Sequence, residues 1–282
     1  MSLSNQNIVI LGGKGMLGTD LVEAFNEKNI DVQVFDLAEF DITNFIQLEE
    51  KIKNADIVIN CAAYTNVDGA ESEKELAYKV NAEAIGRLGE IARNNDIWVL
   101  HISTDFVFDG KGEKSYTETD SPNPISEYGR TKYEGEKLLA QSGCKYCIMR
   151  VQWTYGKAGN NFVSKLIHRA KTNDTVNVVD DQIGSPTATT EVSQTICKLM
   201  GKKPTGLFHF ASSGYVSRYE IAKFIFDKLS MNVNLLPCKT SDYVTPAARP
   251  LNSRFDCTKI TELLGEKIES WQTVLERYLN NL

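Results

Sequence analysis

Two overlapping tyrosine–lysine pairs lie in the segment SEYGRTKYEGEK, residues 126–137. Tyr128 stands four residues before Lys132, and Tyr133 stands four residues before Lys137. Residues four apart on a helix share a face. A free tyrosine has a pKa of about 10, and a neighbouring ammonium group favours the phenolate and lowers that value. Such a pair could supply the proton that a ketone needs when a nicotinamide reduces it.

The spacing alone does not choose between the pairs, because Tyr219 and Lys223 form a third copy. Position in the fold does choose. Catalytic residues of a doubly wound sheet gather at the carboxyl ends of its strands. The helix that holds the first two pairs begins after Pro122 and Pro124, which places Tyr128 near its start and close to that edge.

Hydroxyl and carboxylate groups end the preceding strand at residues 103–105. We therefore predict that Tyr128 and Lys132 are catalytic, with Thr104 as their third member. Tyr133 comes five residues after Tyr128, and at 3.6 residues per turn it points to a different face. The second pair is accordingly interpreted as structural.

A glycine-rich loop, GGKGMLG at residues 12–18, follows the first apolar run. Gly12, Gly15 and Gly18 permit a tight turn and let the backbone approach a pyrophosphate. The next helix would offer its N-terminal N–H groups to that charge. The loop has the context that this motif requires, with a strand before it and an amphipathic helix after it. It predicts dinucleotide binding; the alternative is a turn that packs the helix on the sheet.

Asp36 ends the second apolar run, 18 residues after Gly18. A carboxylate at this place accepts hydrogen bonds from the adenosine ribose and repels a 2′-phosphate. No Arg or Lys follows closely in DLAEFD, so the sequence favours NADH over NADPH. The alternative is a turn aspartate at a strand end.

The first half alternates short Val- and Ile-rich runs with helical patterns, which predicts an α/β, doubly wound (Rossmann) parallel sheet. The expected strands are 7–11, 31–35, 56–60, 98–103 and 146–151. After about residue 155 the loops become richer in Gly, Pro, Ser and Thr. We expect a dinucleotide-binding domain over 1–155 and a smaller substrate lobe over 156–282, interleaved with the sheet. Its expected elements are strands 176–180 and 206–211 and helices around 190–200, 217–230 and 269–280.

Composition narrows the function classes. The net charge is −6 and charged residues make up 24%, so neither nucleic acid nor an anionic membrane is an expected partner. The first residues lack the basic start and apolar run of a signal peptide. Of six cysteines, Cys144 and Cys147 alone form a CxxC pair, which predicts reduced thiols in a cytoplasmic protein and no zinc site.

Longer motifs carry a resemblance to a known family. They are GGKGMLG (12–18), NCAAYTNVDGAE (60–71), STDFVFDG (103–110), EYGRTKYEGE (127–136), WTYGKAGNNFV (153–163), DQIGSPT (181–187) and ARPLNS (248–253). With them the chain resembles the dTDP-4-dehydrorhamnose reductases, which are extended short-chain dehydrogenase/reductases. The resemblance spans nearly the whole chain. It implies reduction by NADH or NADPH of the C4 ketone of a dTDP-4-dehydro-6-deoxysugar, in dTDP-rhamnose and polysaccharide synthesis.

The same resemblance implies roles for individual residues. Tyr128 would donate the proton, Lys132 would assist it and Thr104 would tune it. Thr104, Asp105 and Trp153 would bind the sugar nucleotide. Contacts to the cofactor are implied at Gly15, Met16, Leu17, Asp36, Asp41, Ile42, Ala63, Tyr64 and Thr65, besides Tyr128 and Lys132. Some family members carry Mg²⁺ between subunits, which admits a homodimer and a metal, although the sequence itself shows no metal site.

Three residues depart from the family pattern. Phe106 replaces a commoner Tyr, Gln152 stands where a small residue is usual, and Arg218 stands where the family tends to have Trp. Gln152 and Arg218 lie near the presumed sugar site, so the identity of the deoxysugar stays open.

Two functional interpretations remain open for each of several other polar residues. Asp181 and Gln182 either orient a sugar or fix a turn. Arg249 either meets a diphosphate or is a surface residue. The histidines show no metal-ligand spacing and are interpreted as packing or surface residues: His101, His168 and His209.

Three function classes follow. The first is the ketoreductase. The second is a sugar-nucleotide dehydratase or epimerase on the same fold, but dehydratases usually place a Glu where this chain has Phe106. The third is a non-catalytic, cofactor-binding subunit like the regulatory subunit of methionine adenosyltransferase, against which the full set of Thr104, Tyr128 and Lys132 argues.

Overall fold

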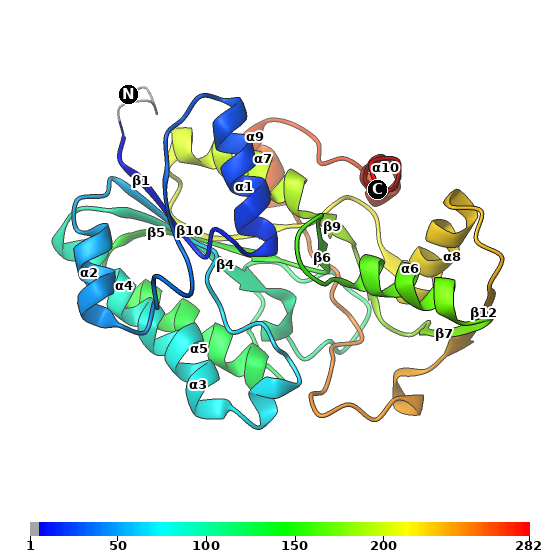
Figure 1. The fold of residues 1–282 in the computed structure, drawn as a ribbon. Helices are drawn as coiled ribbons and strands as arrows, with labels where there is room; N and C mark the ends of the chain where they lie inside the picture. Colours follow the sequence, from blue (N-terminus) through cyan, green and yellow to red (C-terminus); the bar gives the residue numbers. More distant parts are fainter. Residues whose placement is uncertain (1–5) are drawn as a thin grey trace.

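A six-stranded parallel sheet forms the centre of the protein (Figure 1), as the computed structural model of residues 6–282 shows. The strand order is β10-β5-β4-β3-β1-β2. The order changes direction between β1 and β3, where open α/β sheets bind their ligands. The strands are β1 Ile8–Leu11, β2 Gln33–Phe35, β3 Ile57–Asn60, β4 Trp98–Thr104, β5 Lys145–Val151 and β10 Gly206–Phe210. The doubly wound fold predicted from the sequence is confirmed.

Helices cover both faces of this sheet, so consecutive residues along its inner strands are buried. Ile8 and Ile10 pack on one face, while Val9 and Leu11 pack on the other. The first face is covered by α1 Met16–Glu27, α7 Thr189–Lys202 and α9 Thr258–Leu264. The second face is covered by α2 Phe45–Ile52, α4 Ala84–Asn94 and α5 Glu127–Gln141.

A second lobe has a hydrophobic core of its own and lies to the right in Figure 1. It contains α6 Phe162–Thr172, α8 Arg218–Lys228, α10 Trp271–Leu279 and the parallel strands β7 Thr175–Val179 and β12 Asn234–Cys238. The expected helices near 190–200, 217–230 and 269–280 are present, whereas α6, α9 and β12 were not expected. Since α7 and β10 return to the central sheet, the lobe is interleaved with it; the division at residue 155 stays a prediction.

Short elements connect these layers. Two small strand pairs lie near the site, β6 Thr154–Tyr155 with β9 Thr187–Ala188 and β8 Ile183–Gly184 with β11 Val216–Ser217. Helical turns occur at α3 Lys74–Tyr78, at the π-helical turn Lys79–Glu83 and at the 3₁₀ turns Gly69–Glu71, Asp105–Val107 and Thr240–Asp242. Among residues 6–282, no helix is long and apolar enough to cross a membrane. All six cysteines are free thiols.

Two glycines bring α5 unusually close to its neighbours. A Cβ atom at Gly129 would lie 2.1 Å from the Phe106 carbonyl oxygen just after β4. A Cβ atom at Gly135 would lie 2.1 Å from the Asn81 carbonyl oxygen in the π-helical turn. Ser126 caps the helix, its Oγ accepting the Gly129 N–H at 3.2 Å. The absence of these two side chains therefore sets where the start of α5 lies.

We expect Gly135→Ala to lower the free energy of unfolding by about 1–3 kcal/mol, because its methyl group would overlap backbone. Gly201→Ala is the matched control in α7, where an added Cβ meets no atom within 4 Å. That change should stabilise the protein by about 0.5–1 kcal/mol through helix propensity. Denaturant unfolding measures both; equal effects would contradict the close approach at Gly135.

Candidate active site

A cavity of about 710 Å³ lies at the carboxyl edge of the sheet. Almost every residue that the sequence nominated lines it: Gly12, Gly15, Met16, Leu17, Gly18, Asp36, Asp41, Ile42, Ala63, Thr65, Thr104, Asp105, Tyr128, Lys132 and Trp153. Tyr64 is the exception, since its hydroxyl donates to the Glu73 carboxylate instead. The two halves of the chain thus meet around one cavity.

The glycine loop fits a pyrophosphate. Gly12 has φ of 79°, and a Cβ there would lie 2.5 Å from the Ala62 nitrogen. A Cβ at Gly18 would lie 2.2 Å from the Gly12 oxygen. Helix α1 begins with Gly15 as its N-cap, and no side chain caps it. Its first N–H groups therefore remain free to bind an anion.

Asp36 also has a structural role that the sequence did not reveal. Its carboxylate accepts the Lys14 backbone N–H at 2.6 Å and the Leu37 N–H at 2.8 Å. It therefore holds the glycine loop while it faces the cavity. Lys14 also lines the cavity, and its ammonium group pairs with Glu39 at 2.8 Å. A cation thus lines this end of the cavity, and it comes from the loop before Asp36 rather than from the residues after it.

Tyr128 lies in the cavity with its ring edge against Phe106, at a centroid distance of 5.4 Å and an angle of 79°. Burial raises the pKa of the Tyr128 hydroxyl to about 12, and the Asp105 charge adds to that rise. The Thr104 hydroxyl opposes it with a hydrogen bond. In the free protein the phenol is therefore protonated and holds the proton that a ketone would need.

Lys132 is buried beneath Tyr128. Its Nζ donates to the Ile102 carbonyl oxygen at 2.7 Å and lies 3.3 Å from Nε2 of His101. Burial lowers the pKa of the Lys132 amine to about 8, against the carboxylate of Glu136, which raises it. A buried amine with so few partners thus loses its proton far more readily than an exposed lysine does.

This arrangement corrects one part of the sequence argument. The spacing of Tyr128 and Lys132 led us to expect an ammonium group that lowers the tyrosine pKa. In the free protein burial has the larger effect on both groups, raising one pKa and lowering the other. The Thr104 hydroxyl, rather than the lysine, is the group that opposes the rise at Tyr128.

His101 was interpreted as a packing residue, and its contact with the lysine was missed. The ring is fully buried in β4, and its Nδ1 lies 2.9 Å from the Asn60 side-chain nitrogen. Burial and the neighbouring Lys132 hold the pKa of His101 well below its ordinary value. A neutral imidazole therefore separates Asn60 from the lysine. The pairing of β3 with β4 brings Asn60 to His101, and the packing of α5 on β4 brings Lys132 there. No local pattern could therefore have found these contacts.

Thr104 and Asp105 form the polar wall of the cavity. The Thr104 hydroxyl donates to the Asp105 carboxylate at 3.1 Å and accepts the Phe106 N–H at 3.2 Å. The Ser253 hydroxyl donates to the other carboxylate oxygen of Asp105. Burial raises the pKa of Asp105, and these hydrogen bonds oppose the rise.

The other tyrosine–lysine pairs lie outside the cavity-lining residues. Lys137 packs over the Tyr133 ring at 5.0 Å and pairs with Glu134 at 2.6 Å. Tyr219 packs in the core of the second lobe. The position argument thus selects the one pair that reaches the cavity.

Trp153 stands at the cavity in a strained backbone conformation. Its φ is 46°, a value that a bulky residue rarely adopts. Gly184 makes room for the indole, because a Cβ there would lie 2.7 Å from Trp153 Cε2. The Arg218 guanidinium lies 3.7 Å from the centre of the Trp153 ring and also faces the cavity. Gln152 is buried, and its Oε1 accepts the Ser185 N–H at 3.0 Å.

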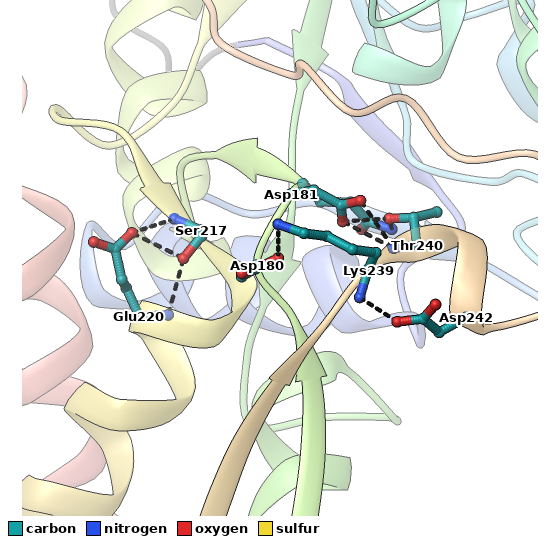
Figure 2. A network of polar contacts seen from close by, with 8 residues as sticks. Asp180, Asp181, Ser217, Glu220, Lys239, Thr240 and Asp242 are labelled. Atoms are coloured by element: carbon teal, nitrogen blue, oxygen red, sulfur yellow. Dashed lines mark hydrogen bonds and ion pairs between the residues drawn. The ribbon is translucent and has the colours of Figure 1, made fainter.

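Asp181 and Gln182 both bind Thr240, which favours a structural role for them; Figure 2 shows the Asp181 contact. The Asp181 carboxylate accepts the Thr240 N–H at 2.9 Å and the Thr240 hydroxyl at 2.7 Å, and the Gln182 amide donates to the same hydroxyl at 3.1 Å. Arg249 donates to Asp68 at 2.7 Å and does not line the cavity. Its assignment to a diphosphate therefore loses support.

Within residues 6–282 no group of three His, Cys, Asp or Glu side chains could hold a metal ion. The remaining histidines lie apart from the cavity lining. His209 is buried between Arg150 and the Tyr116 carbonyl oxygen, as expected of a packing residue.

Comparison with known proteins identifies the family. Residues 6–282 match the family described as RmlD substrate binding domain. A dTDP-4-dehydrorhamnose reductase of Aggregatibacter actinomycetemcomitans is 38% identical over 284 residues, which cover 95% of this chain and 97% of the relative. The chain belongs to the dTDP-4-dehydrorhamnose reductase family. The family predicted from the sequence motifs is thereby confirmed.

Two further relatives are named with a cofactor or a substrate. The crystal structure of the Bacillus anthracis dTDP-4-dehydrorhamnose reductase, solved in complex with NADP, has a TM-score of 0.93 and 38% identity; the match covers 98% of this chain and 99% of that one. A dTDP-4-keto-6-deoxy-D-glucose reductase of Streptomyces niveus is 35% identical over 224 residues, 77% of each chain. Relatives of this chain thus differ in the named keto sugar.

We expect kcat/KM to fall as the pH rises through about 8, if a charged Lys132 assists Tyr128. The Lys132 pKa is lowered to about 8, so the amine is charged below that pH and neutral above it. The pH profile of kcat/KM measures this, with Lys137→Met as the control that should keep the same profile. A flat profile up to pH 9.5 would contradict a role for the charged amine.

We expect Lys14→Met to reduce kcat/KM with NADPH about tenfold more than with NADH, because an ammonium group that lines this end of the cavity can bind a 2′-phosphate. Lys165→Met, at an exposed position in α6, is the control. Equal losses with both cofactors would leave the sequence prediction intact, namely that Asp36 favours NADH and nothing offsets it.

Proposed function

We propose that the protein transfers hydride from NADH or NADPH to the C4 ketone of a dTDP-4-dehydro-6-deoxy-L-sugar. The foremost substrate is dTDP-4-dehydro-L-rhamnose, which would become dTDP-L-rhamnose for polysaccharide synthesis. One observation carries the proposal: Thr104, Tyr128 and Lys132 line the same cavity as the glycine loop. The names of the relatives agree with it.

The cofactor would lie along the glycine loop, with its pyrophosphate at the free N–H groups of α1. When bound, the nicotinamide supplies the hydride to the carbonyl carbon. Tyr128 then gives its hydroxyl proton to the carbonyl oxygen, so hydride and proton together make the alcohol. The Thr104 hydroxyl, which donates to Asp105 in the free protein, would stabilise the resulting phenolate by turning its proton toward it. Lys132, one helical turn away, would assist the next step in its charged form: it would pass a proton to the phenolate and regain one from solvent.

The sugar nucleotide would meet Thr104, Asp105 and Trp153. The buried Asp105 carboxylate accepts from Ser253 and Thr104, so its orientation is fixed before a sugar hydroxyl arrives. Because relatives act on keto sugars of different names, the stereochemistry of the sugar is decided by assay. A homodimer is a further proposal that rests on the family resemblance, and a cytoplasmic location is one that rests on the free cysteines.

Dehydration is disfavoured by Phe106. Its ring packs against Tyr128, at the position where dehydratases usually carry a Glu. A non-catalytic regulatory subunit is disfavoured because the proton donor and its two partners all reach the cavity.

The purified protein should oxidise NADH or NADPH when dTDP-4-dehydro-L-rhamnose is added. Tyr128→Phe should lower kcat on the order of 10²–10⁴-fold, as expected when a general acid is removed. Tyr133→Phe and Tyr219→Phe are matched controls and should stay within about twofold. Absorbance at the nicotinamide band measures turnover. A larger loss in Tyr133→Phe than in Tyr128→Phe would contradict the choice of Tyr128. No turnover by the parent with dTDP-4-dehydro-L-rhamnose or with dTDP-4-keto-6-deoxy-D-glucose would reject the reductase.

A further inference from the structure

Arg218 is the first residue of α8, and its backbone is held firmly. A capping box begins this helix: the Ser217 hydroxyl accepts the Glu220 N–H at 3.1 Å, while the Glu220 carboxylate accepts the Ser217 N–H at 2.9 Å. Figure 2 shows this box beside the Asp181–Thr240 contacts. The Arg218 N–H itself donates to the Gln182 carbonyl oxygen at 3.3 Å. The side chain therefore projects from a fixed point.

Two aromatic rings hold the guanidinium in place. Its central carbon lies 3.7 Å from the centre of the Trp153 ring and 4.7 Å from that of Phe162. Stacking of this kind fixes the plane of the group and favours its charge. It leaves the N–H groups, which project from the edge of the plane, without acceptors.

No acceptor for those N–H groups comes from residues 6–282. Arg218 forms no ion pair there, and its side chain makes no hydrogen bond, although the group is shielded from solvent enough to lower its pKa to about 10. Two charged groups act on this pKa: Asp105 raises it and Arg249 lowers it. Asp105 already accepts from Ser253 and Thr104. Arg218 is partly exposed to the cavity, so its five N–H donors are available to solvent or to a ligand that supplies acceptors.

The other cations near the cavity are already engaged. Lys14 pairs with Glu39 at the cofactor end. Lys132 donates to the Ile102 carbonyl oxygen beneath Tyr128. Arg249 pairs with Asp68 outside the cavity lining. Arg218 is thus the one cavity-lining cation of the described residues whose donors are unused.

We propose that Arg218 binds the diphosphate of the nucleotide-sugar substrate, presenting the edge of a guanidinium that Trp153 and Phe162 hold in plane. A planar guanidinium matches two phosphate oxygens bidentately, and the diphosphate carries the negative charge of such a substrate. The inference rests on the proposed function, because it takes the substrate to be a nucleoside diphosphate sugar. It assigns to Arg218 the diphosphate contact that the sequence had suggested for Arg249.

The proposal also changes the expected role of Trp153. The indole was expected to offer a bare apolar face to the deoxysugar, but one face is covered by Arg218. Trp153 therefore acts here as a positioning residue for the guanidinium. The tryptophan that the family tends to have at position 218 could not bind a diphosphate in this way.

Calorimetry with dTDP tests the proposal, using the parent, Arg218→Gln and Arg218→Lys. Arg218→Gln should weaken dTDP binding about 10–100-fold, the range for a lost hydrogen-bonded charge. Arg218→Lys keeps the positive charge but loses the planar, bidentate donor group, so its dTDP affinity should lie between those of the parent and Arg218→Gln. The salt dependence of dTDP binding should also be smaller in Arg218→Gln. Arg254→Gln is the matched control, because Arg254 packs over Tyr215 and does not line the cavity.

If Arg218 were only structural, its substitution would lower NADH affinity or the melting temperature. Both should stay unchanged in the Arg218 variants. Unchanged dTDP affinity in Arg218→Gln, a parallel loss of NADH affinity, or a parent that does not bind dTDP would each overturn the proposal. The dTDP measurement needs no turnover. A parent that binds dTDP through Arg218 but reduces neither keto sugar would therefore reject the proposed function and leave this inference standing.

Discussion

The site depends on the close contact between the start of α5 and the end of β4. Gly129 allows it, since any side chain there would overlap the Phe106 carbonyl oxygen. The contact places Tyr128 beside Thr104 and against the Phe106 ring. One turn later, Lys132 points inward below the sheet edge, where Ile102 accepts its hydrogen bond. The proton donor, its tuning hydroxyl and the buried amine are thus consequences of one backbone approach.

A buried ion pair keeps the helix in that place. Arg150 of β5 donates to both carboxylate oxygens of Glu136 in α5, at 2.8 and 2.6 Å. The Ser103 hydroxyl donates to the same carboxylate, and the Arg150 guanidinium lies 3.3 Å from His209. Burying two charges costs free energy that their attraction barely offsets. The pair therefore serves orientation more than stability, because it joins β4, α5 and β5 at one point behind Lys132.

Local sequence patterns predicted the parts of this molecule that local physics decides. Runs of Val and Ile gave the strands, and the glycine loop was recognised because its turn and its helix are neighbours in the chain. The choice of Tyr128 over Tyr133 needed only helical geometry and the position of strand ends. The pocket-lining pair is the one that this reasoning selected.

What the sequence could not supply are contacts between distant segments. The Lys14 ammonium and the hold of Asp36 on the glycine loop appear only when β1 and β2 pair. His101 meets Lys132 because β4 packs under α5. Arg249 looked suited to a diphosphate until Asp68, far away in the chain, was seen to bind it. The periodicity of a sequence pattern predicts which face of a helix or strand a residue occupies, but not which distant residue it contacts.

This difference separates the two ends of the cavity. The cofactor end is centred on one continuous segment, the glycine loop with the helix after it, and Asp36 and Ala63 join it from the next two strand ends. A substitution in the loop therefore disturbs folding and binding together. The substrate end is assembled from β4, the strand after α5, the start of α8 and the loop at Ser253. Arg218 contributes to that end without an ion pair to any described residue. A substitution at its position can therefore change which part of the substrate is bound while the Tyr128 chemistry stays as it is.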